Sequence, residues 1–109
     1  MKVLVTGGGG FIGSHIVDLL LENDYQVRVL DSFQKPVHRI GKPDYLPKEV
    51  ELIEGEVTDK SAMNKALQGV EVVFHQVAHQ GFLPDFSAFF HVNSVGTSLL
   101  FELIVKNRY

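Results

Sequence analysis

A run of four glycines near the N-terminus constrains the fold of this chain more than any other feature. The run follows a short apolar stretch, Val3–Val5, and precedes a segment whose apolar residues recur at helical spacing. Gly13 completes the spacing Gly7-x-x-Gly10-x-x-Gly13, and Gly8 starts a second frame, Gly8-x-Gly10-x-x-Gly13. Glycines permit a sharp turn from strand to helix and let a pyrophosphate approach backbone N–H groups closely. In this context the motif predicts a dinucleotide-binding turn; glycines alone would also fit a flexible turn.

Apolar runs and helical patterns alternate along the whole chain. Runs rich in valine, leucine and isoleucine predict strands at residues 3–5, 27–30, 50–54 and 70–77. Helical spacing predicts helices at residues 12–21, 58–67 and 85–106, whereas the prolines within residues 32–49 predict a surface loop. Strands that alternate with helices predict a parallel sheet. We therefore expect an α/β fold of the doubly wound Rossmann type, with strand order 3-2-1-4 and helices on both faces.

Each predicted helix has an apolar side that should face the sheet. In the second helix, Thr58 or Asp59 is the expected N-terminal cap, and Gly69 is the expected C-terminal stop. The residues expected on the apolar sides are Ile12, Ile16, Leu19 and Leu20 in the first helix, Met63, Ala66 and Leu67 in the second, and Phe86, Phe89, Phe90, Thr97, Leu100 and Ile104 in the third.

The predicted sheet is incomplete after its fourth strand. A helix that follows a parallel strand should cross over and lead into another strand, but the sequence ends at Tyr109. Val72–Phe74 would then lie at a bare, hydrophobic edge, which invites pairing with another chain. We therefore expect residues 1–109 to be the truncated N-terminal part of a domain whose catalytic and substrate-binding parts are absent. A homo-oligomer or a strand-exchanged assembly through this edge is also expected.

Asp31 ends the second predicted strand, 18 residues after Gly13. A carboxylate at this place can accept hydrogen bonds from a ribose diol and would repel a 2′-phosphate, so NAD is favoured over NADP. Arg28 and Lys35 lie near enough in the sequence to leave NADP open. The glycine turn, its flanking elements and this acid together predict NAD as the cofactor.

Composition and charge exclude several other classes of protein. A formal net charge of −3 does not supply the basic surface that nucleic-acid binding needs. The chain has no cysteine, which excludes disulfides, cysteine–zinc sites and thiol catalysis. No run approaches the roughly 18 apolar residues of a membrane span, and the N-terminus does not fit a signal peptide. We expect a cytoplasmic protein with no membrane partner.

Five histidines raise the question of a metal site. His75-x-x-x-His79 has the spacing of a helical zinc pair, but it falls at a predicted strand end, where residues four apart lie too far apart to share an ion. Packing and surface roles are therefore expected, and no metal. His79 could still touch a substrate, because ligands of open α/β sheets bind beyond the carboxyl ends of the strands.

Five stretches of the chain, in order, match the pattern of one known family. They are residues 3–15, 29–31, 54–59, 73–78 and 93–97. With them the chain resembles the extended short-chain dehydrogenase/reductases, specifically the NAD-dependent sugar-nucleotide epimerases and dehydratases. In such an enzyme, bound NAD takes a hydride from a nucleotide sugar and returns it after the oxidised intermediate has rearranged. The resemblance thus implies a nucleotide-sugar substrate for the full-length enzyme.

The resemblance also implies which residues bind NAD. They are Gly7, Gly10 and Gly13 in the phosphate turn; Phe11 and Ile12, whose backbone N–H groups face the pyrophosphate; Asp31 at the adenosine ribose, flanked by Ser32; Glu56 and Val57 beside the adenine; Val77, Ala78 and His79 beside the nicotinamide-side ribose; and Asn93, which helps hold the site together.

The chain departs from the family pattern in three places. Glu56 stands where the family usually has Asp, and Gln76-Val77 replaces a more usual Leu-Ala. The family's acid/base pair, Tyr-x-x-x-Lys, is missing, because none of the three tyrosines has a lysine four residues later. We therefore predict no catalytic residue in this chain and no activity of residues 1–109 alone.

Three functional hypotheses follow. The leading one is the NAD-binding portion of a sugar-nucleotide epimerase or dehydratase. The second is a non-catalytic module that binds a dinucleotide or assembles with a partner, which the missing acid/base pair favours. The third is a strand-exchanged oligomer without ligand function, formed through the Val72–Phe74 edge. Light scattering would separate the third from the others, because it predicts no monomer at any concentration.

Overall fold

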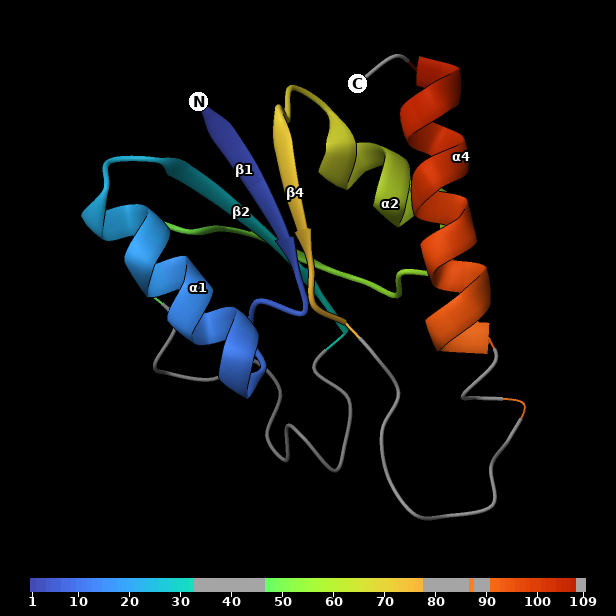
Figure 1. The fold of residues 1–109 in the computed structure, drawn as a ribbon, viewed down its shortest axis with the longest axis horizontal. Coiled ribbons are helices and arrows are strands. Elements are labelled where there is room, and N and C mark those ends of the chain that lie inside the picture. Colours follow the sequence, from blue (N-terminus) through green and yellow to red (C-terminus); the bar gives the residue numbers. More distant parts are fainter. Residues whose placement is uncertain (33–46, 78–86, 88–90, 108–109) are drawn as a thin grey trace.

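A computed structural model describes residues 1–32, 47–77, 87 and 91–107 of the chain. Within these residues a four-stranded, wholly parallel sheet has the order β3-β2-β1-β4 (Figure 1). This order confirms the predicted 3-2-1-4 arrangement. The strands are β1 (Lys2–Thr6), β2 (Gln26–Asp31), β3 (Glu51–Glu54) and β4 (Val72–His75), and the helices are α1 (Phe11–Glu22), α2 (Lys60–Leu67), the π-helical turn η1 (His91–Gly96) and α4 (Thr97–Asn107).

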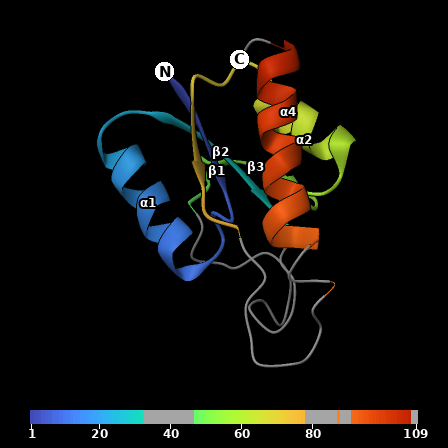
Figure 2. The same ribbon diagram turned by 45° about the vertical axis from the view of Figure 1, so that its right-hand side comes forward.

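The helices cover both faces of the sheet, as the doubly wound prediction requires. Figures 1 and 2 show α1 on one side and α2 with α4 on the other. Alternate residues of β1 supply both cores: Val3 and Val5 pack with Val17 of α1, whereas Leu4 packs with the group that includes Leu100 of α4. This period of two is that of a strand buried on both faces.

The register brings the carboxyl ends of the strands together at one edge. Thr6 of β1 pairs with Leu30 of β2 and with His75 of β4, and Asp31 pairs with Glu54 of β3. The loops that follow the strands therefore start side by side. Of the predicted loop at residues 32–49, residues 33–46 lie outside the described part of the chain.

Helix α1 begins and ends within one residue of its predicted bounds, but its buried side was predicted partly wrong. Ile16 and Leu20 pack against the sheet, whereas Ile12 is 63% and Leu19 is 60% exposed. The buried stripe runs through Gly13 and Val17, because Gly13 lies directly against the glycine turn. This rotates the neighbouring Ile12 towards solvent.

Helix α2 follows its predicted pattern closely. Asp59, rather than Thr58, is the N-terminal cap: its carboxylate accepts hydrogen bonds from the backbone N–H groups of Ser61 and Ala62 at 2.9 and 3.2 Å. Gly69 follows the helix with φ +73°, a left-handed conformation that favours glycine. The predicted apolar residues are all buried: Met63, Ala66 and Leu67.

The prediction of one helix over residues 85–106 is wrong in its described part. Residues 91–96 form the π-helical turn η1, and the α-helix begins only at Thr97. Gly96 lies at this change and packs closely on the core, since a Cβ there would lie 2.7 Å from Cγ2 of Val57. Leu100 is buried and Ile104 packs partly buried against the same core, as predicted; Leu103, which was not predicted there, is also buried, and Thr97 hydrogen-bonds to a histidine. Phe86, Phe89 and Phe90 lie outside the described residues.

Strand β4 lies at the edge of the sheet within the described residues, as predicted. Two of its apolar side chains face solvent in part: Val72 is 38% and Phe74 is 37% exposed. None of the helices in the described part of the chain is long and apolar enough to cross a membrane.

Candidate cofactor site

The glycine turn leaves β1 and enters α1 through a compact set of backbone hydrogen bonds. The Gly7 N–H donates to the Leu30 carbonyl at 2.8 Å, and the Gly10 N–H donates to the Gly7 carbonyl at 3.0 Å. Gly7 adopts φ +72°, a conformation that a residue with a side chain rarely takes. The turn is therefore an ordered structure rather than a flexible run of glycines.

Contacts around the turn explain why several of its positions exclude a side chain. A Cβ at Gly13 would overlap the carbonyl oxygen of Gly7, and a Cβ at Gly8 would lie 2.6 Å from Cγ2 of Val29. Gly10 is less crowded, because a Cβ there would lie 3.3 Å from the Gly7 carbonyl oxygen. Gly8 was part of the second glycine frame in the sequence, and its role is to let the turn lie against β2.

The N-terminus of α1 opens from this turn without a side-chain cap. Gly10 is the N-cap residue, and the first turn of the helix carries no acidic residue. Phe11 and Ile12 are 80% and 63% exposed, so the predicted pyrophosphate contacts lie at the surface of the described structure. An exposed helix N-terminus has unpaired N–H groups and a partial positive charge, both of which suit a phosphate.

Asp31 reaches this turn from the end of β2. Its Oδ2 accepts a hydrogen bond from the Gly9 N–H at 2.9 Å, and the residue is 7% exposed. A carboxylate has about four lone-pair sites, so it can accept this bond and still accept a hydroxyl. Ser32, its predicted neighbour in the site, follows it and is half-buried. The structure thus brings the acid and the glycine turn together.

The nearness of Arg28 to Asp31 in the sequence left NADP open as a cofactor, but the Arg28 side chain points to another part of the molecule. Its guanidinium forms an ion pair with Glu51 and donates to the carbonyls of Ala66 and Gln68 at the end of α2, each at 2.7 Å. The hydrogen bond from Arg28 lowers the pKa of Glu51 below its usual value and outweighs the opposing effect of desolvation. Arg28 is therefore occupied away from Asp31, and Lys35 lies outside the described residues.

The residues predicted beside the adenine differ in their exposure. Glu56 is half-buried after β3, whereas Val57 is 2% exposed and packs in the core. Val57 also meets Gly96 of η1. Val57 therefore offers almost no surface to a ligand. Its predicted role beside the adenine would depend on the position that it gives to the neighbouring Glu56.

The residues predicted at the nicotinamide side are described only in part. Val77 is half-buried, and its backbone N lies so close to Gly7 that a Cβ on that glycine would approach it to 2.9 Å. Asn93, which was predicted to help hold the site together, is exposed on η1. Ala78 and His79 lie outside the described residues, so their roles stay a prediction.

One polar residue at this edge was missed by sequence reasoning. His75, at the end of β4, is half-buried; its Nδ1 lies 2.6 Å from Oγ1 of Thr6 and its Nε2 lies 3.0 Å from Oγ1 of Thr97. Burial lowers the pKa of His75, which favours the neutral ring. Its place at a predicted strand end was the available signal, because ligands of open α/β sheets bind beyond the carboxyl ends of the strands. Within the described residues no group of three potential metal ligands comes together.

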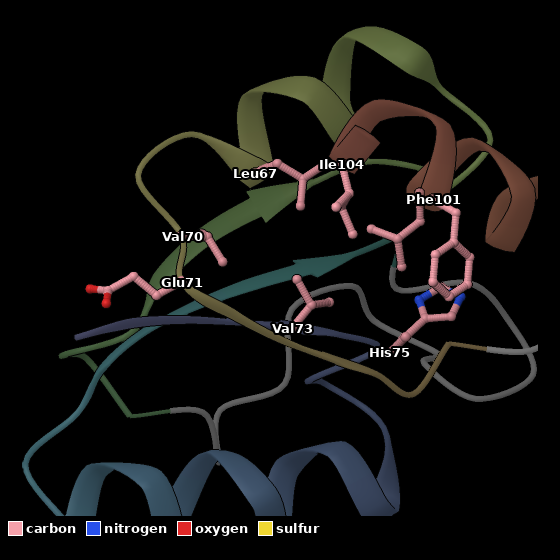
Figure 3. Close-up of a pocket in the computed structure, with 8 residues that line it drawn as sticks. Leu67, Val70, Glu71, Val73, His75, Phe101 and Ile104 are labelled. Carbon is pink, nitrogen blue, oxygen red and sulfur yellow. The ribbon is translucent and has the colours of Figure 1, made fainter. Parts of the chain in front are cut away.

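A largely apolar cavity of about 360 Å³ lies beside His75, between β4, α2 and α4. Figure 3 shows the His75 ring beside Phe101 at one end and Glu71 at the other. The cavity follows the exposed strand edge rather than the glycine turn. Its lining residues are Leu67, Val70, Glu71, Val73, His75, Leu100, Phe101 and Ile104.

The fold and the site define a doubly wound α/β unit with a glycine turn at the N-terminus of α1 and an acid at the end of its second strand. Comparisons with known proteins agree with this class. A sequence model of the NAD dependent epimerase/dehydratase family matches residues 3–109. The chain therefore belongs to that family.

Solved structures and curated relatives of known name resemble the chain closely. UDP-glucose 4-epimerase of Thermus thermophilus, in complex with NAD, is 36% identical with a TM-score of 0.85 over 97% of this chain. DesIV, a dTDP-glucose 4,6-dehydratase of Streptomyces venezuelae, is 32% identical with a TM-score of 0.82, also over 97%. A putative UDP-glucose 4-epimerase of Methanocaldococcus jannaschii is 43% identical over 70% of this chain.

The chain is much shorter than these relatives. It spans 34% of the Thermus structure, 36% of DesIV and 24% of the archaeal protein. Residues 1–109 thus correspond to a minor part of each relative.

Proposed function

We propose that residues 1–109 form the NAD-binding portion of a nucleotide-sugar epimerase or dehydratase. One observation carries the proposal: the uncapped N-terminus of α1 opens from a turn without side chains, and the carboxylate of Asp31 is hydrogen-bonded to that turn at Gly9. The turn suits the pyrophosphate, and the acid suits the adenosine ribose. The NAD-bound relatives support the choice of cofactor.

Different residues of the site would hold different parts of NAD. The phosphate turn consists of Gly7, Gly10 and Gly13, with the N–H groups of Phe11 and Ile12 turned to the pyrophosphate. Asp31 and Ser32 would hold the adenosine ribose, and Glu56 with Val57 would border the adenine. Val77, Ala78 and His79 would lie beside the nicotinamide-side ribose, and Asn93 would help hold the site together. Bound NAD supplies a hydride acceptor and donor for the sugar.

We propose a nucleotide sugar as the substrate of the full-length enzyme, supported by the names of the most similar relatives. The 109-residue chain lacks a Tyr-x-x-x-Lys pair, so we expect it to bind NAD without catalysing epimerisation or dehydration. Its cytoplasmic location stays a prediction.

Substitution of Asp31 tests the cofactor proposal. Asp31→Asn removes the charge and one acceptor, so NAD affinity should fall about 10- to 100-fold, the range for hydrogen bonds to a charged group. Affinity for NADP should fall less, because the repulsion of its 2′-phosphate is also removed. Calorimetric titration with both cofactors measures the two changes.

Asp18→Asn is the matched control for this experiment. Asp18 is an exposed carboxylate on α1, away from the turn's hydrogen bonds, and its replacement should leave NAD affinity unchanged. Equal NAD affinity of the wild type and Asp31→Asn, with the control also unchanged, would contradict the role assigned to Asp31. Absence of any NAD binding by the folded wild type would refute the proposed function.

The edge of the sheet favours an assembly function as a second candidate. Val72 and Phe74 are partly exposed on β4, and the apolar cavity continues this surface. We propose that two copies of the chain pair through this edge, as an oligomer or by strand exchange.

A charge on the edge strand tests this assembly. Val72→Lys should shift the protein from dimer to monomer in light scattering, because a lysine on an edge strand opposes pairing. Val105→Lys adds the same charge to an exposed position of α4, where it should change nothing. A wild-type protein that stays monomeric at every concentration would exclude the assembly.

A further inference from the structure

A chain of hydrogen bonds joins the carboxyl ends of two strands to the π-helical turn. The Gln76 N–H is shared between the Thr6 carbonyl at 3.0 Å and Thr6 Oγ1 at 3.1 Å, and Thr6 Oγ1 lies 2.6 Å from His75 Nδ1. On the other side of the ring, Nε2 lies 3.0 Å from Thr97 Oγ1, which donates to the Asn93 carbonyl at 2.9 Å. The bonds thus run from β1 through β4 to η1.

Counting protons along this chain assigns the state of the His75 ring. The Thr97 hydroxyl has one hydrogen and gives it to the Asn93 carbonyl, so its oxygen must accept from His75 Nε2–H. A neutral ring protonated at Nε2 has an acceptor at Nδ1, so the Thr6 hydroxyl donates there. The Gln76 N–H uses another lone pair of Thr6, and every group in the chain is satisfied. The lowered pKa of His75 agrees with a neutral ring.

We propose that His75, as its Nε2–H tautomer, is a positioning residue that fixes Asn93 in the cofactor site through Thr97. This inference rests on the proposed function, because Asn93 matters only where NAD is bound. A π-helical turn is a rare backbone form that often marks a functional site. The Thr97 hydroxyl donates to the Asn93 carbonyl in this turn, and the His75 ring connects Thr97 to the sheet.

Two neighbouring hydroxyls make a matched pair for the test. Thr97 and Ser98 both donate to the carbonyl four residues earlier, at 2.9 and 2.7 Å, but in the described structure only Thr97 also meets His75. Thr97→Val should weaken NAD binding about three- to tenfold, the range for one or two lost hydrogen bonds. Thr97→Ser should restore the affinity, and Ser98→Ala should leave it at the wild-type value.

Two substitutions of the histidine separate its two nitrogen atoms. A glutamine amide reaches as far as Nε2 and can donate to Thr97, whereas an asparagine amide reaches only as far as Nδ1 and can accept from Thr6. His75→Gln should therefore keep NAD affinity within about threefold of the wild type, and His75→Asn should lose affinity like Thr97→Val. If the wild type binds NAD, equal losses of NAD affinity in the two histidine variants, or no loss in Thr97→Val, would overturn the proposal.

An NMR measurement tests the tautomer without the cofactor. At pH 7 the ¹⁵N spectrum of the His75 ring should show a protonated Nε2 and an unprotonated Nδ1, and Thr97→Val should shift the side-chain amide of Asn93. A ring protonated at Nδ1, or an Asn93 signal that does not respond, would refute the inference by itself. A wild type that shows the expected spectrum but no NAD binding would refute the proposed function, and with it the role of this link for NAD.

Discussion

Replacing Gly13 by alanine is expected to unfold the junction between β1 and α1 and to abolish NAD binding. The new Cβ would overlap the Gly7 carbonyl oxygen, a backbone atom that itself accepts from the Gly10 N–H. Backbone cannot move aside as a flexible side chain does, so α1 must lift from the turn. We expect a loss of about 2–3 kcal/mol of unfolding free energy, typical of overpacking in a tight core. Thermal unfolding and calorimetry with NAD measure the two effects.

Gly69→Ala is the control for the Gly13 substitution. Gly69 has φ +73°, but a Cβ there would meet open space. The cost should be only that of a left-handed backbone, about 1 kcal/mol, and NAD affinity should not change. If Gly13→Ala kept wild-type stability and affinity, the close packing of the glycine turn would be contradicted.

Arg28→Met is expected to be the most destabilising change outside the cofactor site. Arg28 is 7% exposed and is the hydrogen-bond donor to the carbonyls of Ala66 and Gln68 at the end of α2. Methionine fills a similar volume but donates nothing, so these carbonyls would lose their partner. At roughly 1–3 kcal/mol for each unsatisfied buried group, we expect a loss of about 3 kcal/mol in urea unfolding.

Glu51→Gln separates the ion pair from the carbonyl contacts of Arg28. The Glu51 side chain is 51% exposed, so removing its charge should cost less than about 1 kcal/mol near pH 7. Its pKa is lower in the folded protein than in the unfolded chain, so its contribution is present above pH 4.5 and is lost as the pH falls through the folded value. Equal losses for Arg28→Met and Glu51→Gln would contradict the importance of the carbonyl contacts.

The sheet could be predicted because its information is local in the sequence. Short runs rich in valine, leucine and isoleucine became β1 to β4, and the alternation with helices implied their parallel order. The caps of α2 were also predictable, since Asp59 and Gly69 act on their own neighbours. The Asp31–Gly9 hydrogen bond was not predicted, but the parallel order places the end of β2 beside the turn that follows β1.

The errors occurred where distant contacts outweigh local pattern. The spacing of apolar residues over 85–106 predicts one continuous helix, but the close contact of Gly96 with Val57 lies at the change from the π-helical turn to α4. Thr97 lies on the predicted apolar side of the helix, but its hydroxyl forms a hydrogen bond with His75 of β4. Leu19 was similarly misplaced because the packing of Gly13 on the turn sets the rotation of α1.

Mapping NAD binding by amide chemical shifts tests the central claim most directly. With ¹⁵N-labelled protein titrated with NAD, the largest changes should fall on the amides of Gly8–Gly13 and on Asp31 and Ser32, at the carboxyl edge of the sheet. Amides beside the cavity, such as those of Val70 and Phe101, should stay unchanged. Changes concentrated around the cavity, or none at saturating NAD, would contradict the assignment of the glycine turn as the cofactor site.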